Sequence, residues 1–296
     1  MQLAANYSAP LAEMVRSGQL GLSRLKCPMI PHVLARAEAL LPTYVHFPLV
    51  AGSGQGDATV DDTGEAPDWA EIEALLARTG TPHVNLHLTA LARRFPRIAA
   101  DSRGSADAGQ VAEVFARDIL PVVRRFGAER VIVENDPPLG GANLACSFLP
   151  EAIRQVVEES GCGLLLDLAH VRLAAQHLGL DPREYAAALP LERVREMHVS
   201  GIQLFRPEWG ERMRAAGVSA DRLARLSGRH IDHLPMTDED WVFLEWAMAE
   251  VRSGRCAEPW VVAFEHGGAG SLIWEASTDT TALREQVPRM RVLVEG

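Results

Sequence analysis

Residues 131–167 read VIVENDPPLGGANLACSFLPEAIRQVVEESGCGLLLD, and their pattern decides the fold. Two short apolar runs, at 131–135 and 163–167, end in polar residues and are typical of buried strands. Between them, residues 148–160 have apolar side chains at helical spacing. The stretch therefore predicts a strand–helix–strand unit, whose crossover helix makes the two strands parallel.

The same alternation extends over the whole chain. Strands are expected at Gln2–Tyr7, Leu22–Cys27, Tyr44–Val50, His83–Leu88, Val131–Asn135, Gly163–Asp167, Arg195–Val199 and Val261–Glu265. Helices are expected near 10–17, 31–41, 68–79, 108–126, 148–160, 181–188, 238–252 and 279–293. Strands and helices that alternate in this way predict an α/β fold, a single (β/α)8 TIM barrel rather than an open sheet.

Composition places the chain among cytoplasmic globular proteins. No linker or change of composition divides the 296 residues, so a single domain over 1–296 is expected. The four cysteines lack CxxC pairing, and the sequence has no apolar run of about 18 residues. No signal peptide is expected, because the first residues lack a basic region followed by an apolar run. The net charge of −10 disfavours a nucleic-acid or membrane partner.

Three loops interrupt the even spacing of the strands, at 51–66, 137–147 and 202–236. All three follow strand ends on the face where barrels build active sites. The last carries a set of arginines: Arg206, Arg212, Arg214, Arg222, Arg225 and Arg229. All three are expected to be surface loops, with a lid as the alternative for 51–66. A peptide substrate would have to fit the excursions at 51–66 and 202–236.

Ionisable side chains recur where the apolar strands end. They are His46, His87, Glu134, Asp167 with His170, His198 and Glu265, and the segment GRHIDHLPM adds His230, Asp232 and His233. One such residue alone is more simply explained as a hydrogen-bonded core residue. A mixed set from six strands is explained together by divalent cations, whose usual ligands are imidazole and carboxylate. The set exceeds the needs of one ion, so two or three metal ions are predicted.

Lys26 is the only lysine in the chain, and it ends the second predicted strand. Its ammonium would reach the barrel mouth and hold an anionic substrate or intermediate. The alternative is a surface lysine whose head group reaches solvent.

The stretches GLLLDLAH and VIVENDP, and the order of the ionisable residues, resemble those of the xylose-isomerase-like superfamily, which includes endonuclease IV. The resemblance implies one ion held by His46, His87 and Glu134. A second ion would be held by Glu134, Asp167, His198 and Glu265, and a third by His170 and the segment 230–233. That segment departs from the Asp-x-His pattern, since it reads His-Ile-Asp-His.

The second half of the chain resembles the multinuclear non-haem iron-dependent oxidases, the family of the methanobactin synthase subunit. The stretches LLLDLAHVRLAA, ALPLERVREMHVSGIQ and HLPMTDEDWVFL carry this resemblance. It implies oxidation of cysteine or other residues in ribosomally made peptides. His170 stands where that family commonly has asparagine.

The favoured hypothesis is an oxidase with two or three irons that bind a substrate thiolate and activate dioxygen. Its partners would be a peptide or small-molecule substrate and a peptide-recognition protein. One alternative is a sugar isomerase or epimerase with one manganese or similar ion, in which Glu134 and Glu265 act as acid and base. Another is a zinc phosphodiesterase like endonuclease IV. A metal-binding protein without catalytic activity also stays open.

Overall fold

The computed structural model describes residues 1–61, 63–136 and 142–296. Residue 62 and residues 137–141, which fall within two of the predicted loops, lie outside the described residues. The chain divides into two compact units, which are described separately. Unit 1 consists of Met1–His46, Met197–Glu250 and Pro259–Gly296, and unit 2 consists of Phe47–Glu196 and Val251–Glu258. The prediction of one domain stays a prediction.

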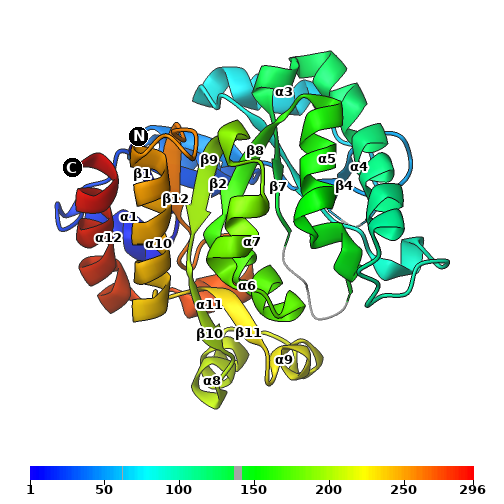
Figure 1. The fold of residues 1–296 in the computed structure, drawn as a ribbon. Coiled ribbons are helices and arrows are strands. Elements are labelled where there is room, and N and C mark those ends of the chain that lie inside the picture. Colours follow the sequence, from blue (N-terminus) through cyan, green and yellow to red (C-terminus); the bar gives the residue numbers. More distant parts are fainter. Residues whose placement is uncertain (62, 137–141) are drawn as a thin grey trace. The chain divides into compact units, whose positions relative to one another are not determined.

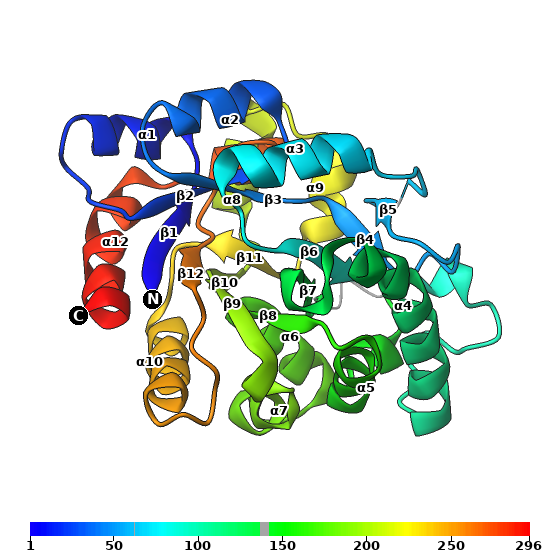
Figure 2. The same ribbon diagram turned by 90° about the horizontal axis from the view of Figure 1, so that it is seen from above.

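Unit 1 contains parallel strands in the order β3-β2-β1-β12-β9. Their bounds are β3 Thr43–His46, β2 Arg24–Pro28, β1 Gln2–Asn6, β12 Val261–Phe264 and β9 Val194–Val199, of which Met197–Val199 lie in this unit. Figure 2 shows β12 between β1 and β9. These strands form where the apolar runs predict them, with ends that differ by one or two residues.

Four helices of this unit lie in the predicted places. They are α1 Ala9–Arg16, α2 Pro31–Glu38, α10 Asp238–Arg252 and α12 Thr280–Glu295. The short helix α11 (Leu272–Ser277) was not predicted. The Ser8 hydroxyl caps α1 by accepting the N–H of Leu11, and Pro10 follows in the first turn, as the sequence indicates. Helix α2 packs on β2 and β3, and α12 packs on β1.

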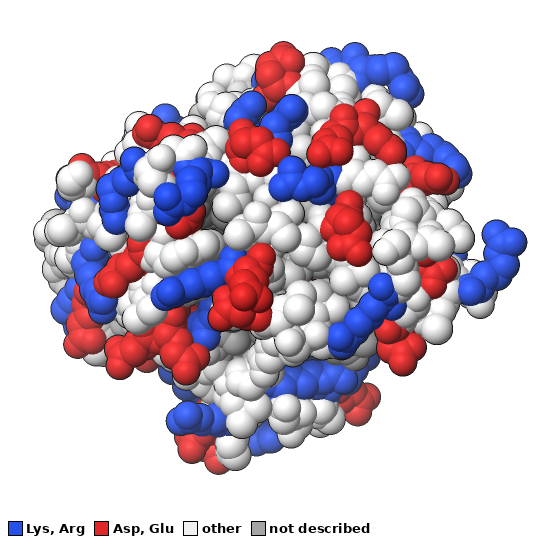
Figure 3. Space-filling view, viewed as in Figure 1, with Lys and Arg blue, Asp and Glu red and all other residues white. Residues whose placement is uncertain are grey.

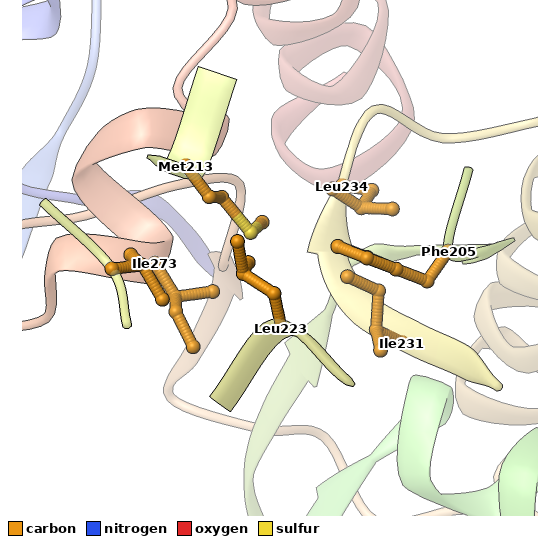
Figure 4. Packing of buried hydrophobic residues seen from close by; sticks show 7 residues of the cluster. Phe205, Met213, Leu223, Ile231, Leu234 and Ile273 are labelled. Atoms are coloured by element: carbon orange, nitrogen blue, oxygen red, sulfur yellow. The ribbon is translucent and has the colours of Figure 1, made fainter. Parts of the chain in front are cut away.

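The excursion at 202–236 is a folded element of unit 1. It consists of the antiparallel strands β10 (Gly201–Leu204) and β11 (His230–Leu234) with the helices α8 (Pro207–Ala215) and α9 (Ala220–Leu226) (Figure 1). Figure 4 shows the apolar core on which it packs, formed by Phe205, Met213, Val218, Leu223, Ile231, Leu234 and, from α11, Ile273. At the base of the ribbon, a Cβ on Gly201 would lie 2.0 Å from the carbonyl oxygen of Pro235, so only glycine fits.

The arginines of the excursion are exposed on this element. The Arg212 guanidinium lies 5.0 Å from the Trp209 ring centroid and 3.8 Å from the Asp279 carboxylate. On the face shown in Figure 3, acidic and basic side chains are interspersed. The arginines therefore share this surface with acidic side chains, as expected for a solvated face.

Unit 2 contains the strands β8, β7, β6 and β4 in that order, all parallel, with β5 antiparallel to β4. Their bounds are β8 Gly163–Asp167, β7 Val131–Glu134, β6 Val84–Leu88, β4 Leu49–Ala51 and β5 Thr59–Val60. The helices are α3 Trp69–Thr79, α4 Ser105–Phe126, α5 Pro150–Ser160, α6 Leu168–Leu178 and α7 Pro182–Ala188 (Figure 1). Short 3-10 turns lie at η1 Ala92–Arg94, η2 Ala128–Arg130, η3 Ala145–Phe148 and η4 Leu191–Arg193.

Two further local features differ from the sequence prediction. The strand expected at Tyr44–Val50 is broken into β3 and β4, because the Asn85 side chain takes both backbone hydrogen bonds of Phe47, at 2.8 and 3.0 Å. Helix α6 was not predicted, because its apolar residues continue directly from those of β8. Its start is fixed by Asp167, whose carboxylate accepts the N–H of His170 at 2.8 Å.

The loop that follows β4 folds around a buried carboxylate. Asp118 of α4 is fully buried and accepts the backbone N–H groups of Gly52, Gly54 and Gly56 at 2.8–3.0 Å. The Ser53 hydroxyl donates a further bond to it at 3.1 Å. The glycines thus form a nest of N–H donors around an internal anion.

We expect Gly52→Ala to lower the free energy of unfolding by about 1–3 kcal/mol. Gly52 has φ +112°, and a Cβ there would lie 2.4 Å from the carbonyl oxygen of Thr89. Gly179→Ala is the matched control, because Gly179 has φ +70° but open space around its Cβ position. Denaturant unfolding measures the stability that each variant loses. Equal losses of stability in Gly52→Ala and Gly179→Ala would contradict a clash at Gly52.

Among the helices of the described residues, none combines the length and the apolarity needed to cross a membrane.

Candidate metal centre

Polar side chains gather in unit 2 where β6, β7 and β8 end. The parallel register pairs His87 of β6 with Glu134 of β7, and Glu134 in turn with Leu165 of β8. Asp167 ends β8, and His170 lies in the first turn of α6. Because parallel strands end at the same edge of a sheet, four of the predicted ligands come together here.

The Glu134 carboxylate lies between two imidazoles. Its Oε2 is 3.4 Å from Nδ1 of His87, and its Oε1 is 3.4 Å from Nδ1 of His170. Nε2 of His170 is 3.7 Å from Oδ2 of Asp167. Glu134, Asp167 and His170 are all buried, and each offers a ligand atom within 4.8 Å of those of the other two. Three donors of this kind can surround one cation.

This donor set fits a divalent metal ion. Glu134 is 1% exposed and Asp167 is 0% exposed, so both carboxylates are shielded from water. They also lie close to each other. An uncompensated buried charge costs several kcal/mol, which a cation between the carboxylates would offset. Imidazole and carboxylate together are ligands of iron, zinc and manganese.

Asn135 and the backbone orient these ligands. The Asn135 side chain joins β7 to β8, because its amide donates to the carbonyl of Asp167 at 3.1 Å and accepts the N–H of Asp167 at 2.9 Å. Nδ1 of His170 lies 2.8 Å from the backbone carbonyl of Asn135. A carbonyl only accepts, so we assign the proton to Nδ1, which leaves the Nε2 lone pair toward Asp167. Metal-binding histidines commonly have this arrangement.

His87 lies beside two carboxylates. Burial alone would lower its pKa, but Glu134 and Asp136 hold the pKa above 6.5. Nδ1 of His87 is 3.6 Å from Oδ1 of Asp136, a residue that the sequence analysis did not select.

Unit 1 contains a second cluster, centred on Glu265 directly after β12. The Lys26 ammonium donates to Glu265 Oε1, and Nδ1 of His198 lies 3.3 Å from the same oxygen. Nε2 of His233 lies 3.8 Å from Oε2. The rings of His46 and His198 are 5.3 Å apart between centroids. Four predicted candidates of this unit therefore gather around one carboxylate: Lys26, His46, His198 and His233.

Lys26 is 5% exposed and Glu265 is 4% exposed, so the ion pair is internal. The alternative of a surface lysine is therefore wrong. Burial alone would raise the pKa of Glu265, but His198 and Lys26, together with two further histidines, hold it well below 4.5. Glu265 is therefore ionised at neutral pH.

Within the segment 230–233, the residues point in different directions. His233 faces Glu265 and stacks on Trp274, with ring centroids 4.2 Å apart and planes 17° apart. Its φ of +57° turns the chain at this point. His230 is exposed at the opposite end of β11, and Asp232 is half-buried. The structure brings His233 to Glu265, and the ligand roles of all three residues stay predictions.

The sequence analysis missed several polar residues that lie beside the predicted ligands or hydrogen-bond to their neighbours. They are Thr89, Asn135, Asp136, Asn143 and, beside His233, Ser200. One signal was available for two of them. Thr89 and Asp136 follow His87 and Glu134 by two residues, the spacing that keeps side chains on one face of a strand.

Comparison with known proteins supports the predicted relation. Residues 111–224 match the sequence model of the family described as RiPP precursor modification enzyme MbnB/TglH/ChrH. This segment contains Glu134, Asp167, His170 and His198. A UPF0276 protein of Acaryochloris marina is 29% identical over 89 residues, which cover 30% of this chain and 32% of that protein. One of Bordetella pertussis is 38% identical over 105 residues, which cover 29% of this chain and 36% of its own length. The alignments thus span about a third of these relatives.

A solved structure shows the fold. A xylose isomerase domain-containing protein from Salmonella typhimurium LT2 superposes with a TM-score of 0.54 at 16% sequence identity, covering 100% of this chain and 98% of its own. The prediction of a xylose-isomerase-like TIM barrel is therefore confirmed, as is the similarity to the MbnB/TglH/ChrH enzymes.

Proposed function

We propose that this chain, a xylose-isomerase-like barrel similar over residues 111–224 to RiPP precursor modification enzymes, is a metal-dependent enzyme that oxidises a peptide or thiol substrate. The metal would be iron, with two or three ions per chain as the resemblance implies. The buried set of Glu134, Asp167 and His170 is the observation that carries the proposal. When bound, iron would supply the redox chemistry and open positions for a thiolate and dioxygen.

The chain's own groups would hold the metal and control charge around it. Glu134 lies between two imidazoles, and Asn135 fixes both Asp167 and the His170 tautomer. This rigid arrangement lowers the cost of ordering ligands when a cation binds. In unit 1, Glu265 and Lys26 would provide a carboxylate and an ammonium whose charges nearly cancel inside the protein.

A metal-dependent isomerase or epimerase is the second candidate. The observation that favours it is that the three ligands of unit 2 suffice for a single ion. The substrate would be a small molecule rather than a peptide.

Elemental mass spectrometry tests the proposal on protein purified anaerobically, without chelator or a nickel column. We expect two or three irons per chain, and oxygen uptake when cysteine-containing peptides are added, which prior chelation abolishes. One manganese or cobalt per chain would favour the isomerase, and zinc would favour phosphoester hydrolysis. Protein that binds no metal would overturn the proposal.

A further inference from the structure

We infer that Asp136 is a positioning residue that orients the His87 imidazole for metal binding. The inference rests on the proposed function, because it assigns a role at the metal centre of unit 2. It adds a residue that is not among the predicted ligands and that the sequence analysis did not select.

Asp136 lies just beyond the strand ends that carry His87 and Glu134. His87 pairs with Glu134 across β6 and β7. Thr89 directly follows β6 and Asp136 lies two residues after β7, and the Thr89 hydroxyl donates to Oδ2 of Asp136. This second pair therefore forms just past the ends of the two strands.

Asn143 holds the same carboxylate oxygen from the other direction. Its side-chain amide donates to Oδ2 of Asp136 at 3.4 Å. The Asn143 backbone is itself fixed, because Ala92 donates to the carbonyl of Ala142 at 2.8 Å and Leu144 donates to that of Ala90 at 2.9 Å. The three side chains are 9% exposed or less, so this is a buried, oriented carboxylate.

With Oδ2 held in this way, Oδ1 of Asp136 is turned toward His87, 3.6 Å from Nδ1. Glu134 lies 3.4 Å from the same nitrogen. A cation held by Glu134 would engage that carboxylate, and Asp136 would then remain as the carboxylate partner of Nδ1. A carboxylate at Nδ1 keeps the proton there and leaves Nε2 as the ligand nitrogen.

Asp136→Asn tests this role, because asparagine keeps the shape and removes the charge. Co2+ alone, added to the metal-free protein and followed by its visible absorption, is expected to bind about 10–100-fold more weakly. In the metal-free variant, 15N NMR of the His87 ring should show less of the Nδ1-protonated tautomer. Thr89→Val, which removes one hydroxyl that orients Asp136, should give a smaller shift in the same direction.

Asp101→Asn is the control, because Asp101 is exposed in the same unit. Unchanged Co2+ affinity and an unchanged His87 tautomer in Asp136→Asn would overturn the inference. If the unaltered protein binds no Co2+, the proposed function fails, while the tautomer measurement still decides the role of Asp136. A Thr89→Val protein with the expected tautomer shift would support the inference even if Asp136→Asn did not fold.

Discussion

Glu134→Gln is expected to weaken divalent-metal binding by at least about 100-fold, more than the loss typical of residues that only support a ligand. Glu134 is the carboxylate that lies between His87 and His170, and it is 1% exposed. Glutamine has nearly the same shape, so the buried volume stays filled. What is lost is the negative charge that draws a cation to this position.

Equilibrium titration of metal-free protein with Fe2+ under anaerobic conditions measures this effect. Glu113→Gln is the matched control, because Glu113 is an exposed glutamate on α4 of the same unit. The control should bind metal as the unaltered protein does. Equal affinities for Glu134→Gln and the control would remove Glu134 from the set of ligands.

Lys26→Met is expected to lower the free energy of unfolding of the metal-free protein by about 3–5 kcal/mol. The substitution removes the ammonium from an internal ion pair and leaves the Glu265 carboxylate buried without it. Adding Glu265→Gln should restore most of this stability, because the amide carries no charge. Denaturant unfolding of both variants measures the two changes, and a double variant no more stable than Lys26→Met would contradict the account.

The stability lost in Lys26→Met should also depend on pH. The pKa of Glu265 in the folded protein is held well below 4.5, so its ionised form contributes stability above that pH. This contribution disappears as the pH falls through the lowered pKa. Lys26→Met removes one cause of the lowered pKa. The difference in free energy of unfolding between the unaltered protein and Lys26→Met should therefore be full at pH 7 and shrink below about pH 4.5.

Much of this fold could be predicted because the apolar runs are short and separated. The run GLLLD predicts β8 with both of its bounds, and the polar residue that follows each run predicts where the side chains meet. Helix α6 could not be separated from β8, because Asp167 is both the last residue of the strand and the cap of the helix. Because Asp167 has both roles, the apolar pattern shows no boundary between the strand and the helix.

The parts that could not be predicted depend on contacts between residues distant in sequence. The break after β3 requires the Asn85 side chain to bond to Phe47, across 38 positions. The orientation of Asp136 depends on its hydrogen bond with Thr89, 47 positions earlier. Periodicity describes neighbours along one element, so it carries no information about such pairs.

The nest around Asp118 has a consequence for glycine-rich stretches such as GSGQG. Backbone amides that converge in this way serve many proteins as a cradle for a phosphate from solution. Here the chain provides the anion itself, tethered to α4, so these amides are already saturated. Asp118 is thus a permanent ligand of these amides, covalently part of the chain. The segment after β4 therefore takes its conformation from α4, a helix that begins more than forty residues later in the chain.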